Sequence, residues 1–255
     1  MFKILQTRFH QGYRTIKYPL ETPVLPERYR GRLQLDPAKC QSSCNQCVPV
    51  CPTQAITKNG SLSLDLGKCV FCTDCVEACS SGALEYTRDH RMAVDKRADL
   101  VLTGQELKLA HGMGDEIVQI LGRALRLREV CAGSCNACDL DINVLNTVGW
   151  DLSRFGIQFV ASPRHADGLV VTGSIPRNMH YALKDCYAAT PDPKIVVAIG
   201  ACAISGGVFA NTPAEGNGIG DLLPVDLYIP GCPPHPLTIL DGFLRLIHRI
   251  RDAQP

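Results

Sequence analysis

The chain has 255 residues, of which 45% are apolar and 20% are charged, and this is the composition of a globular protein rather than a disordered one. The formal net charge is +1, which gives no general electrostatic reason to expect nucleic acid or an anionic membrane as the partner. No apolar run approaches the roughly 20 residues that span a bilayer, and the first residues lack the apolar core of a signal peptide. We therefore expect a cytoplasmic chain with no direct membrane insertion.

The 14 cysteines stand out because they are clustered rather than scattered. Eight lie in residues 40–79, three lie in residues 131–138, and the other three are Cys186, Cys202 and Cys232. In a reducing compartment, clustered thiols bind metal more often than they pair as disulfides. We therefore interpret the clusters as metal ligands.

Residues 1–35 are rich in Pro, Arg and Tyr and show no sustained periodicity. Because prolines restrict the backbone and lack a hydrogen-bond donor, we predict an extended arm here. An arm of this composition cannot form a core alone, and we expect it to contact a partner protein.

Residues 36–88 contain two similar units. Each starts with Lys-Cys, continues through four cysteines, and ends in a small-residue turn and a short β-type strand. The second unit, from Cys69, has the spacing C-x2-C-x2-C-x3-C, whereas in the first unit three residues separate Cys40 from Cys44. Such runs wrap the corners of an iron–sulfur cubane, and the intervening backbone amides stabilise its negative charge. The repeat also predicts pseudo-twofold symmetry.

This segment resembles a bacterial two-cluster ferredoxin domain, and we assign residues 36–97 to an α+β, ferredoxin-like domain. In such domains the fourth cysteine of each run ligates the other cluster. The resemblance therefore implies two [4Fe–4S] clusters with crossed ligands. Cluster 1 has the ligands Cys40, Cys44, Cys47 and Cys79, and cluster 2 has the ligands Cys51, Cys69, Cys72 and Cys75.

Zinc is the alternative metal for this segment, because C-x2-C pairs also occur in zinc ribbons. Zinc has no use for a third cysteine two residues further on, so the spacing favours iron–sulfur clusters. A single cubane with structural cysteines left over stays open as a second alternative.

Residues 98–127 form a connector. Gly112 and Gly114 interrupt it, and Asp115 is a candidate N-cap for a helix that continues to Leu127.

Residues 128–255 alternate between apolar runs rich in Val and Ile and segments with helical spacing. The expected strands are 157–161, 168–172, 194–199 and 226–229, and the expected helices are 178–188 and 237–250. This alternation predicts an α/β, flavodoxin-like domain with an open, mostly parallel sheet. Sites in such sheets form at the carboxyl ends of strands, which is where Cys202 and Cys232 fall.

Four motifs of this domain occur in the order Ser-Cys-Asn-Ala-Cys (134–138), Ser-Pro-Arg-His-Ala-Asp (162–167), Gly-Ala-Cys (200–202) and Pro-Gly-Cys-Pro-Pro (230–234). The domain resembles the small subunits of [NiFe]-hydrogenases and the equivalent subunit of respiratory complex I. That complex I subunit has two adjacent cysteines where this chain has Cys135 and Cys138, so the membrane-bound, energy-converting hydrogenases are more similar. The stretches Tyr-Pro-Leu-Glu (18–21), Tyr-Arg-Gly (29–31) and Cys-Val-Phe-Cys (69–72) also resemble the ferredoxin-like subunit of formate hydrogenlyase. The chain therefore looks like a fusion of two neighbouring subunits of such a complex.

By this resemblance, a third, proximal [4Fe–4S] cluster is held by Cys135, Cys138, Cys202 and Cys232. Arg164 and His165 are expected near it, although a structural salt bridge is an equal expectation for Arg164. Cys131 is close enough in sequence to compete as a ligand, but the resemblance makes it a spectator. Cys186 is expected in the core. Relatives carry glutamates where this chain has Asp139 and Asp141, and Asp141 is alternatively a helix cap.

We therefore predict an electron-transfer subunit of a hydrogenase-type oxidoreductase complex, with three [4Fe–4S] clusters and no catalytic residue of its own. The expected partners are a large catalytic subunit containing [NiFe] and further electron-transfer and membrane subunits, which would hold the chain at the inner face of the cell membrane. One alternative is the equivalent subunit of a complex I-like quinone or ion-translocating oxidoreductase without nickel. The other is a zinc-stabilised scaffold.

Overall fold

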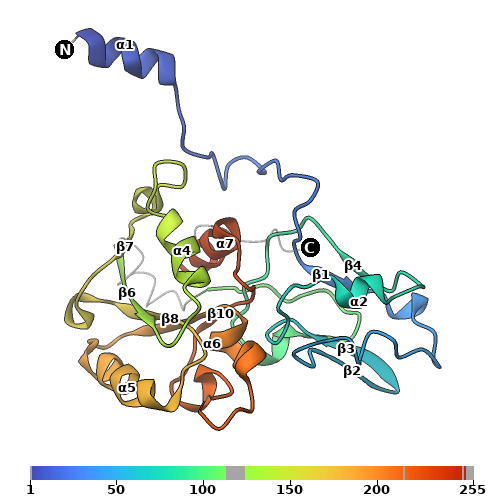
Figure 1. The fold of residues 1–255 in the computed structure, drawn as a ribbon. Coiled ribbons are helices and arrows are strands. Elements are labelled where there is room, and N and C mark those ends of the chain that lie inside the picture. The colour runs from blue at the N-terminus through green and yellow to red at the C-terminus, as the bar shows by residue number, and fades with distance from the viewer. Residues whose placement is uncertain (1, 113–123, 215, 249, 251–255) are drawn as a thin grey trace.

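The structure is a computed structural model, and it describes residues 2–112, 124–214, 216–248 and 250. The chain begins with helix α1 (Phe2–Gln11), which projects beyond the body of the protein (Figure 1). The prediction of an extended arm is therefore wrong for residues 2–11. The prolines on which it rested begin at Pro19, after the helix, so nothing in residues 2–11 prevents helix formation. Residues 12–32 form no regular helix or strand.

The ferredoxin-like unit contains two small antiparallel sheets. Their elements are β1 (Leu33–Leu35), β2 (Ile56–Asn59), β3 (Ser61–Asp65), β4 (Leu84–Tyr86) and β5 (Val101–Leu102), with α2 (Asp74–Glu77) and 3-10 helices at Pro37–Lys39 and Arg97–Leu100. Strand β1 precedes the first cysteine run and pairs with β4, which follows the second run. Strand β3 precedes the second run and pairs with β2, which follows the first. This reciprocal pairing is the pseudo-twofold arrangement that the internal repeat predicts.

The second unit is a five-stranded parallel sheet with the order β10-β9-β8-β6-β7. Its strands are β6 (Leu125–Cys131), β7 (Ile157–Phe159), β8 (Gly168–Thr172), β9 (Ile195–Ile199) and β10 (Leu227–Ile229). Its helices are α4 (Ala137–Val144), α5 (His180–Ala189), α6 (Ala201–Ser205) and α7 (Pro236–Leu246), with 3-10 turns at Leu152–Phe155, Pro163–His165, Arg177–Met179, Gly207–Phe209 and Ile219–Asp221. The ferredoxin-like and flavodoxin-like fold classes are both confirmed.

The connector differs from its prediction. Most of the expected helix falls on residues 113–123, which lie outside the described residues. The helix does not reach Leu127, because Leu125 and Leu127 are buried in strand β6 while Arg126 between them is exposed. This alternation is the two-residue period of a β-strand.

One core joins the two units. Leu169 and Val171 of β8 face a hydrophobic core that also contains residues of the ferredoxin-like unit, such as Leu64 and Leu84. Val170, between them, faces a second core formed with α4 and α7. An isolated antiparallel bridge from Val94 to Tyr228 adds two backbone hydrogen bonds, of 3.0 and 2.9 Å, at the edge strand β10. The ferredoxin-like unit therefore covers one face of the parallel sheet as part of its core.

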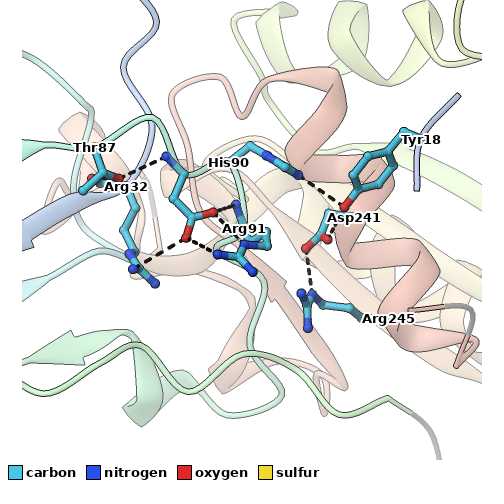
Figure 2. Close-up of polar contacts among 8 residues, drawn as sticks. Tyr18, Arg32, Thr87, His90, Arg91, Asp241 and Arg245 are labelled. Atoms are coloured by element: carbon cyan, nitrogen blue, oxygen red, sulfur yellow. Dashed lines mark hydrogen bonds and ion pairs between the residues drawn. The ribbon is translucent and has the colours of Figure 1, made fainter. Parts of the chain in front are cut away.

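The arm is fastened to the body by a buried polar network, shown in Figure 2. The Tyr18 hydroxyl donates to Asp241 Oδ1 at 2.5 Å and lies 3.2 Å from His90 Nε2. Arg245 Nε donates to the other carboxylate oxygen of Asp241 at 2.8 Å. Asp241 and Arg245 are both almost fully buried on α7, so the ion pair is desolvated. The network joins the arm, the end of the ferredoxin-like unit and the last described helix beside a cavity of about 650 Å³.

Among the described residues, no helix combines the length and the apolarity that crossing a membrane requires.

Candidate metal centres

The thiol of Cys47 and three others form a group of four in the ferredoxin-like unit. Burial raises the pKa of the Cys47 thiol. Three neighbouring thiols raise this pKa further, and they belong to Cys79, Cys40 and Cys44. The structure therefore brings together the four residues that the crossed pattern assigns to cluster 1.

A second group surrounds Cys69. Burial raises the pKa of the Cys69 thiol to about 12, and the thiols of Cys75, Cys51 and Cys72 contribute to the rise. The pKa of Cys75 is also raised to about 12, first by burial and then by neighbours that include Cys47 of the first group. The two groups are therefore adjacent. Burial and neighbouring thiols disfavour the thiolate at these positions, so these cysteines are poor free nucleophiles.

The fourth cysteine of each run is held in the same way. Cys51 Sγ accepts a hydrogen bond from the backbone N–H of Ala55 at 3.2 Å, and Cys79 Sγ accepts one from Ala83 at 3.3 Å. Each sulfur also lies beside a hydroxyl group two residues further along the chain, at 3.8 Å and 3.6 Å respectively. Backbone N–H donors to ligand sulfur are the contacts that stabilise iron–sulfur clusters, so these residues fit the group.

Lys58 and Tyr86 occupy equivalent positions of the two repeats and were missed by sequence reasoning. Each donates a hydrogen bond to the backbone carbonyl of the second cysteine in a run, Lys58 to Cys44 and Tyr86 to Cys72. Lys58 Nζ also lies 3.7 Å from Cys40 Sγ. The longer Cys40–Cys44 loop is therefore closed by a cation, whereas the shorter loop is closed by a neutral phenol. Lys58 and Tyr86 lie at the same sequence distance after the fourth cysteine of their runs, and this equal spacing could have identified them.

A third group forms at the carboxyl ends of three strands. Cys135 and Cys138 follow β6, Cys202 follows β9, and Cys232 follows β10. Burial is the main cause that raises the pKa of Cys138, and the thiols of Cys202, Cys232 and Cys135 also contribute. The prediction from sheet topology and the prediction from the motifs thus lead to the same edge of the sheet.

Two glycines make room around these sulfurs. A Cβ atom on Gly200 would lie 2.6 Å from Cys138 Sγ, and its φ of +89° also disfavours a side chain. A Cβ atom on Gly207 would lie 2.9 Å from Cys202 Sγ. Such clearance lets backbone approach a bulky inorganic group, so the third group also fits a cluster.

Asp139 fastens the loop that carries the third group. Its buried carboxylate accepts hydrogen bonds from Thr172 Oγ1 at 2.6 Å and from Ser134 Oγ. Burial opposes ionisation, but these hydrogen bonds prevail and lower the pKa of Asp139. Cys131 Sγ lies 3.1 Å from Ser134 Oγ and 3.5 Å from Asp139, so it belongs to this polar network. Nearby, burial and Asp139 raise the pKa of Glu129 to about 7.

The structure does not bring Arg164 and His165 to the third group. Both are exposed on a 3-10 turn that precedes β8. Gly168 at the start of β8 pairs with Leu127, whereas Cys131 is at the opposite end of β6, where the thiols gather. The motif gives residue order along the chain but not the strand end at which a loop lies.

Two other candidates take structural positions. Asp141 lies inside α4, whose N-cap is Asn136, so it does not cap the helix. It is half-buried, and burial raises its pKa. Cys186 lies on α5 and packs against the core, as expected.

The second and third groups adjoin each other. Ser205 Oγ on α6 donates to the carbonyl oxygen of Gly67 at 2.9 Å, and Gly67 precedes Cys69 by two residues. A cavity of about 350 Å³ separates Phe71, in the loop of the second group, from Cys232 of the third. The junction between the two units thus lies directly between two of the thiol groups.

Within the described residues, no three or more His, Cys, Asp or Glu side chains are arranged so that they could hold a single metal ion. A structural zinc site requires four such ligands around one ion. Metal and sulfide analysis of the protein distinguishes a zinc scaffold from iron–sulfur clusters.

Residues 135–246 match the family model described as NADH ubiquinone oxidoreductase, 20 Kd subunit, and residues 32–94 match a 4Fe-4S dicluster domain. The probable membrane-bound hydrogenase subunit mbhJ of Pyrococcus furiosus is 42% identical over 135 residues, which cover 53% of this chain and 81% of that protein. The chain belongs to the 20 Kd subunit family.

Other relatives are similar over about half of the chain. Formate hydrogenlyase subunit 7 of Escherichia coli is 40% identical over 51% of this chain and 51% of its own length. A subunit of the NADH-quinone oxidoreductase of Citrifermentans bemidjiense is 47% identical over 46% of this chain and 68% of its own length. The predicted fusion of a dicluster ferredoxin unit with a 20 Kd subunit domain is therefore confirmed. The matches support an electron-transfer subunit of a hydrogenase-like or complex I-like oxidoreductase, with iron–sulfur clusters as cofactors.

Proposed function

We propose that this chain is an electron-transfer subunit that holds three [4Fe–4S] clusters and connects them to a large catalytic subunit. The observation that supports this most strongly is that twelve cysteines, eight from the repeat and four from three strand ends, gather in three groups of four. When bound, such clusters supply one-electron chemistry.

The proposed ligands follow the three groups. Cluster 1 takes Cys40, Cys44, Cys47 and Cys79; cluster 2 takes Cys51, Cys69, Cys72 and Cys75; and the proximal cluster takes Cys135, Cys138, Cys202 and Cys232. The chain's own residues supply buried thiols, backbone N–H donors to sulfur, and glycines that clear space. These features are what the protein contributes to the stability and potential of a cluster.

The arrangement of the groups supports one spatial order for the three sites. The thiol of Cys47 contributes to the raised pKa of Cys75, which indicates that the cluster 1 and cluster 2 sites are neighbours. The hydrogen bond from Ser205 to Gly67 makes the cluster 2 and proximal sites neighbours. The cluster 2 site is therefore the central one, and the cluster 1 site is the outer end within this chain.

The proximal end is the side on which a partner subunit would dock. Cys135 and Cys232 are exposed, whereas Cys138 is half-buried. The shell around a cluster controls its access to solvent, and a second protein at this end would complete that shell. We infer that a large catalytic subunit covers them in a membrane-associated complex.

The two-residue spacing between Cys135 and Cys138 favours a hydrogenase-type complex whose large subunit contains nickel and iron. The second candidate is a complex I-like oxidoreductase without nickel, which the similarity to the NADH-quinone oxidoreductase of Citrifermentans bemidjiense favours. Nickel analysis of the complex purified through this chain distinguishes them. About one nickel per complex supports the hydrogenase type, and iron without nickel supports the other.

A reductive titration of the anaerobically purified chain, followed by electron paramagnetic resonance, tests the cluster assignment. We expect three reducible cubane signals. Cys79→Ser should remove the signal of cluster 1, and Cys232→Ser that of the proximal cluster. If Cys79→Ser and Cys232→Ser each lost both signals of the ferredoxin-like unit, the assignment would be contradicted.

A further inference from the structure

Helix α1 stands apart from the rest of the chain. None of residues 2–11 is buried, and the helix projects beyond the body (Figure 1). Isolated helices shorter than about 12 residues are marginal in water unless packing against a surface stabilises them. A helix of 10 residues with no buried side chain therefore indicates a surface outside this chain.

Three apolar residues of the helix share one face, and Ile4 lies on the opposite side. Phe2, Leu5 and Phe9 recur at spacings of three and four residues, which places them on the same side. Phe2 is 88% exposed and Phe9 is 87% exposed, and Tyr13 just beyond the helix is 88% exposed. Several large apolar side chains exposed on one short segment mark an interaction site rather than ordinary surface.

The charged side chains of this segment are all basic. Residues 2–16 contain Lys3, Arg8 and Arg14 and no Asp or Glu, a local excess that the net charge of +1 for the whole chain conceals. On α1, Lys3 and His10 lie to one side of the apolar face, and Arg8 lies to the other. This pattern is typical of helices that lie in the headgroup region of an anionic bilayer.

The attachment of α1 is fixed on the body. Thr15 Oγ1 donates to the carbonyl oxygen of Val148 at 2.8 Å. The backbone N–H of Ile16 donates to the carbonyl oxygen of Gly149 at 2.8 Å. Val148 itself is 78% exposed. The short segment of residues 12–14 is thus the tether between an anchored arm and an unanchored helix.

We propose that α1 is a membrane-surface helix that lays Phe2, Leu5 and Phe9 into the headgroup boundary of an anionic phospholipid bilayer. Lys3 and Arg8 contact the headgroups, with their aliphatic stems along the boundary. The contact is interfacial and reversible, and it adds to attachment through partner subunits. It rests on α1 alone and is independent of the number of clusters.

Sedimentation of the full-length, anaerobically purified protein with vesicles tests the proposal. The protein binds vesicles of equal parts phosphatidylglycerol and phosphatidylcholine, binds phosphatidylcholine vesicles weakly, and is released by salt. A double variant, Lys3→Gln with Arg8→Gln, binds about 25-fold more weakly, since each basic residue at an anionic surface contributes about 1 kcal/mol, or about fivefold. Phe2→Ser with Phe9→Ser abolishes binding.

Tyr181→Ser is the matched control, because Tyr181 is 76% exposed on α5, away from the arm. It leaves vesicle binding unchanged, and the visible absorbance of every variant shows that its clusters are retained. The proposal is overturned if the wild-type protein stays in the supernatant with anionic vesicles, or if the α1 variants bind as well as the Tyr181 control. It is also overturned if the Phe2 and Phe9 substitutions release a partner subunit from the complex while vesicle binding is unchanged, because α1 then docks on protein.

Discussion

The hydroxyl of Ser205 donates a hydrogen bond to the carbonyl oxygen of Gly67 at 2.9 Å, across 138 residues of sequence. Ser205 ends the helix that carries Cys202, and Gly67 begins the loop that carries Cys69. The contact holds two thiol groups from different units in a fixed relation. A side chain on Gly67 would disturb it, because a Cβ atom there would lie 2.7 Å from Arg97 Cζ and 2.8 Å from Ile204 Cγ2.

We therefore expect Gly67→Val to destabilise the junction by about 1–3 kcal/mol, the usual cost of overpacking a core. The measurement is the temperature at which visible absorbance is lost under anaerobic conditions. Gly220→Ala is the control, since a Cβ atom on Gly220 meets nothing within 4 Å. Equal melting of the two variants would show that the junction is not packed as described.

Gly200→Ala tests the space around the proximal site. A Cβ atom at this position would lie 2.6 Å from Cys138 Sγ, so the ligand would have to move. We expect iron to fall from about 12 to about 8 atoms per chain, since one cubane of four irons is lost. Gly149→Ala is the matched control, because its nearest neighbour would be 4.0 Å away. Full iron content in Gly200→Ala would argue against a cluster on Cys138.

Serine variants of Cys131 and Cys135 distinguish the spectator thiol from the ligand thiol within one loop. Cys131 Sγ is engaged with Ser134 and Asp139, so we expect Cys131→Ser to retain all the iron. Cys135→Ser should lose the proximal signal in electron paramagnetic resonance. Loss of iron from Cys131→Ser, with the proximal signal retained in Cys135→Ser, would make Cys131 the ligand and Cys135 the spectator.

Lys58 is expected to raise the midpoint potential of cluster 1, because a cation near a ligand sulfur favours the more negative, reduced state. Its Nζ lies 3.7 Å from Cys40 Sγ. Lys58→Met should lower that potential by on the order of 40 mV, which corresponds to about 1 kcal/mol for one electron. Tyr86→Phe, at the equivalent position of the other repeat, removes a hydrogen bond without removing a charge and should shift cluster 2 less. A potentiometric titration that finds cluster 1 unmoved would contradict this role.

His90 should make the stability of the arm depend on pH. Burial lowers the pKa of His90, although Asp241 opposes the shift. A histidine in the unfolded chain has a pKa of about 6.5. Below that pH the unfolded state therefore binds a proton more readily than the folded state, in which His90 is buried. Stability is therefore present above about pH 6.5 and declines as the pH falls further.

The difference in melting temperature between wild type and His90→Gln, measured at several pH values, isolates this contribution. We expect the variant to lose part of the decline below about pH 6.5. His111→Gln, at an exposed histidine, is the control and should keep the wild-type profile. A decline of the same steepness in His90→Gln and wild type would assign the pH dependence to other groups.

Local patterns predicted much of this molecule. The apolar run at residues 168–172 is strand β8 with the same bounds, because a parallel strand buried on both faces is continuously apolar. The resemblance to two-cluster ferredoxins, rather than the spacing alone, led us to expect Cys79 beside the first run and Cys51 beside the second, which is where the structure places these thiols. Helix α1 was missed because the prolines of the following segment dominated the composition of the whole arm.

Contacts between distant residues were not predictable from a single sequence. Tyr18 and Asp241 are 223 residues apart, and neither lies in a motif that points to the other. Lys58 reaches its loop only because β2 folds back beside it. Arg164 was expected near the proximal site from its motif alone, and its position was decided by the register of β8 against β6.

We propose that twelve cysteines hold three cubanes within this one chain. Iron and acid-labile sulfide, measured together on the anaerobically purified full-length protein, test it most directly. We predict about 12 iron and about 12 sulfide per chain, four of each for every cubane. Zinc without sulfide, or about 4 iron per chain, would contradict it.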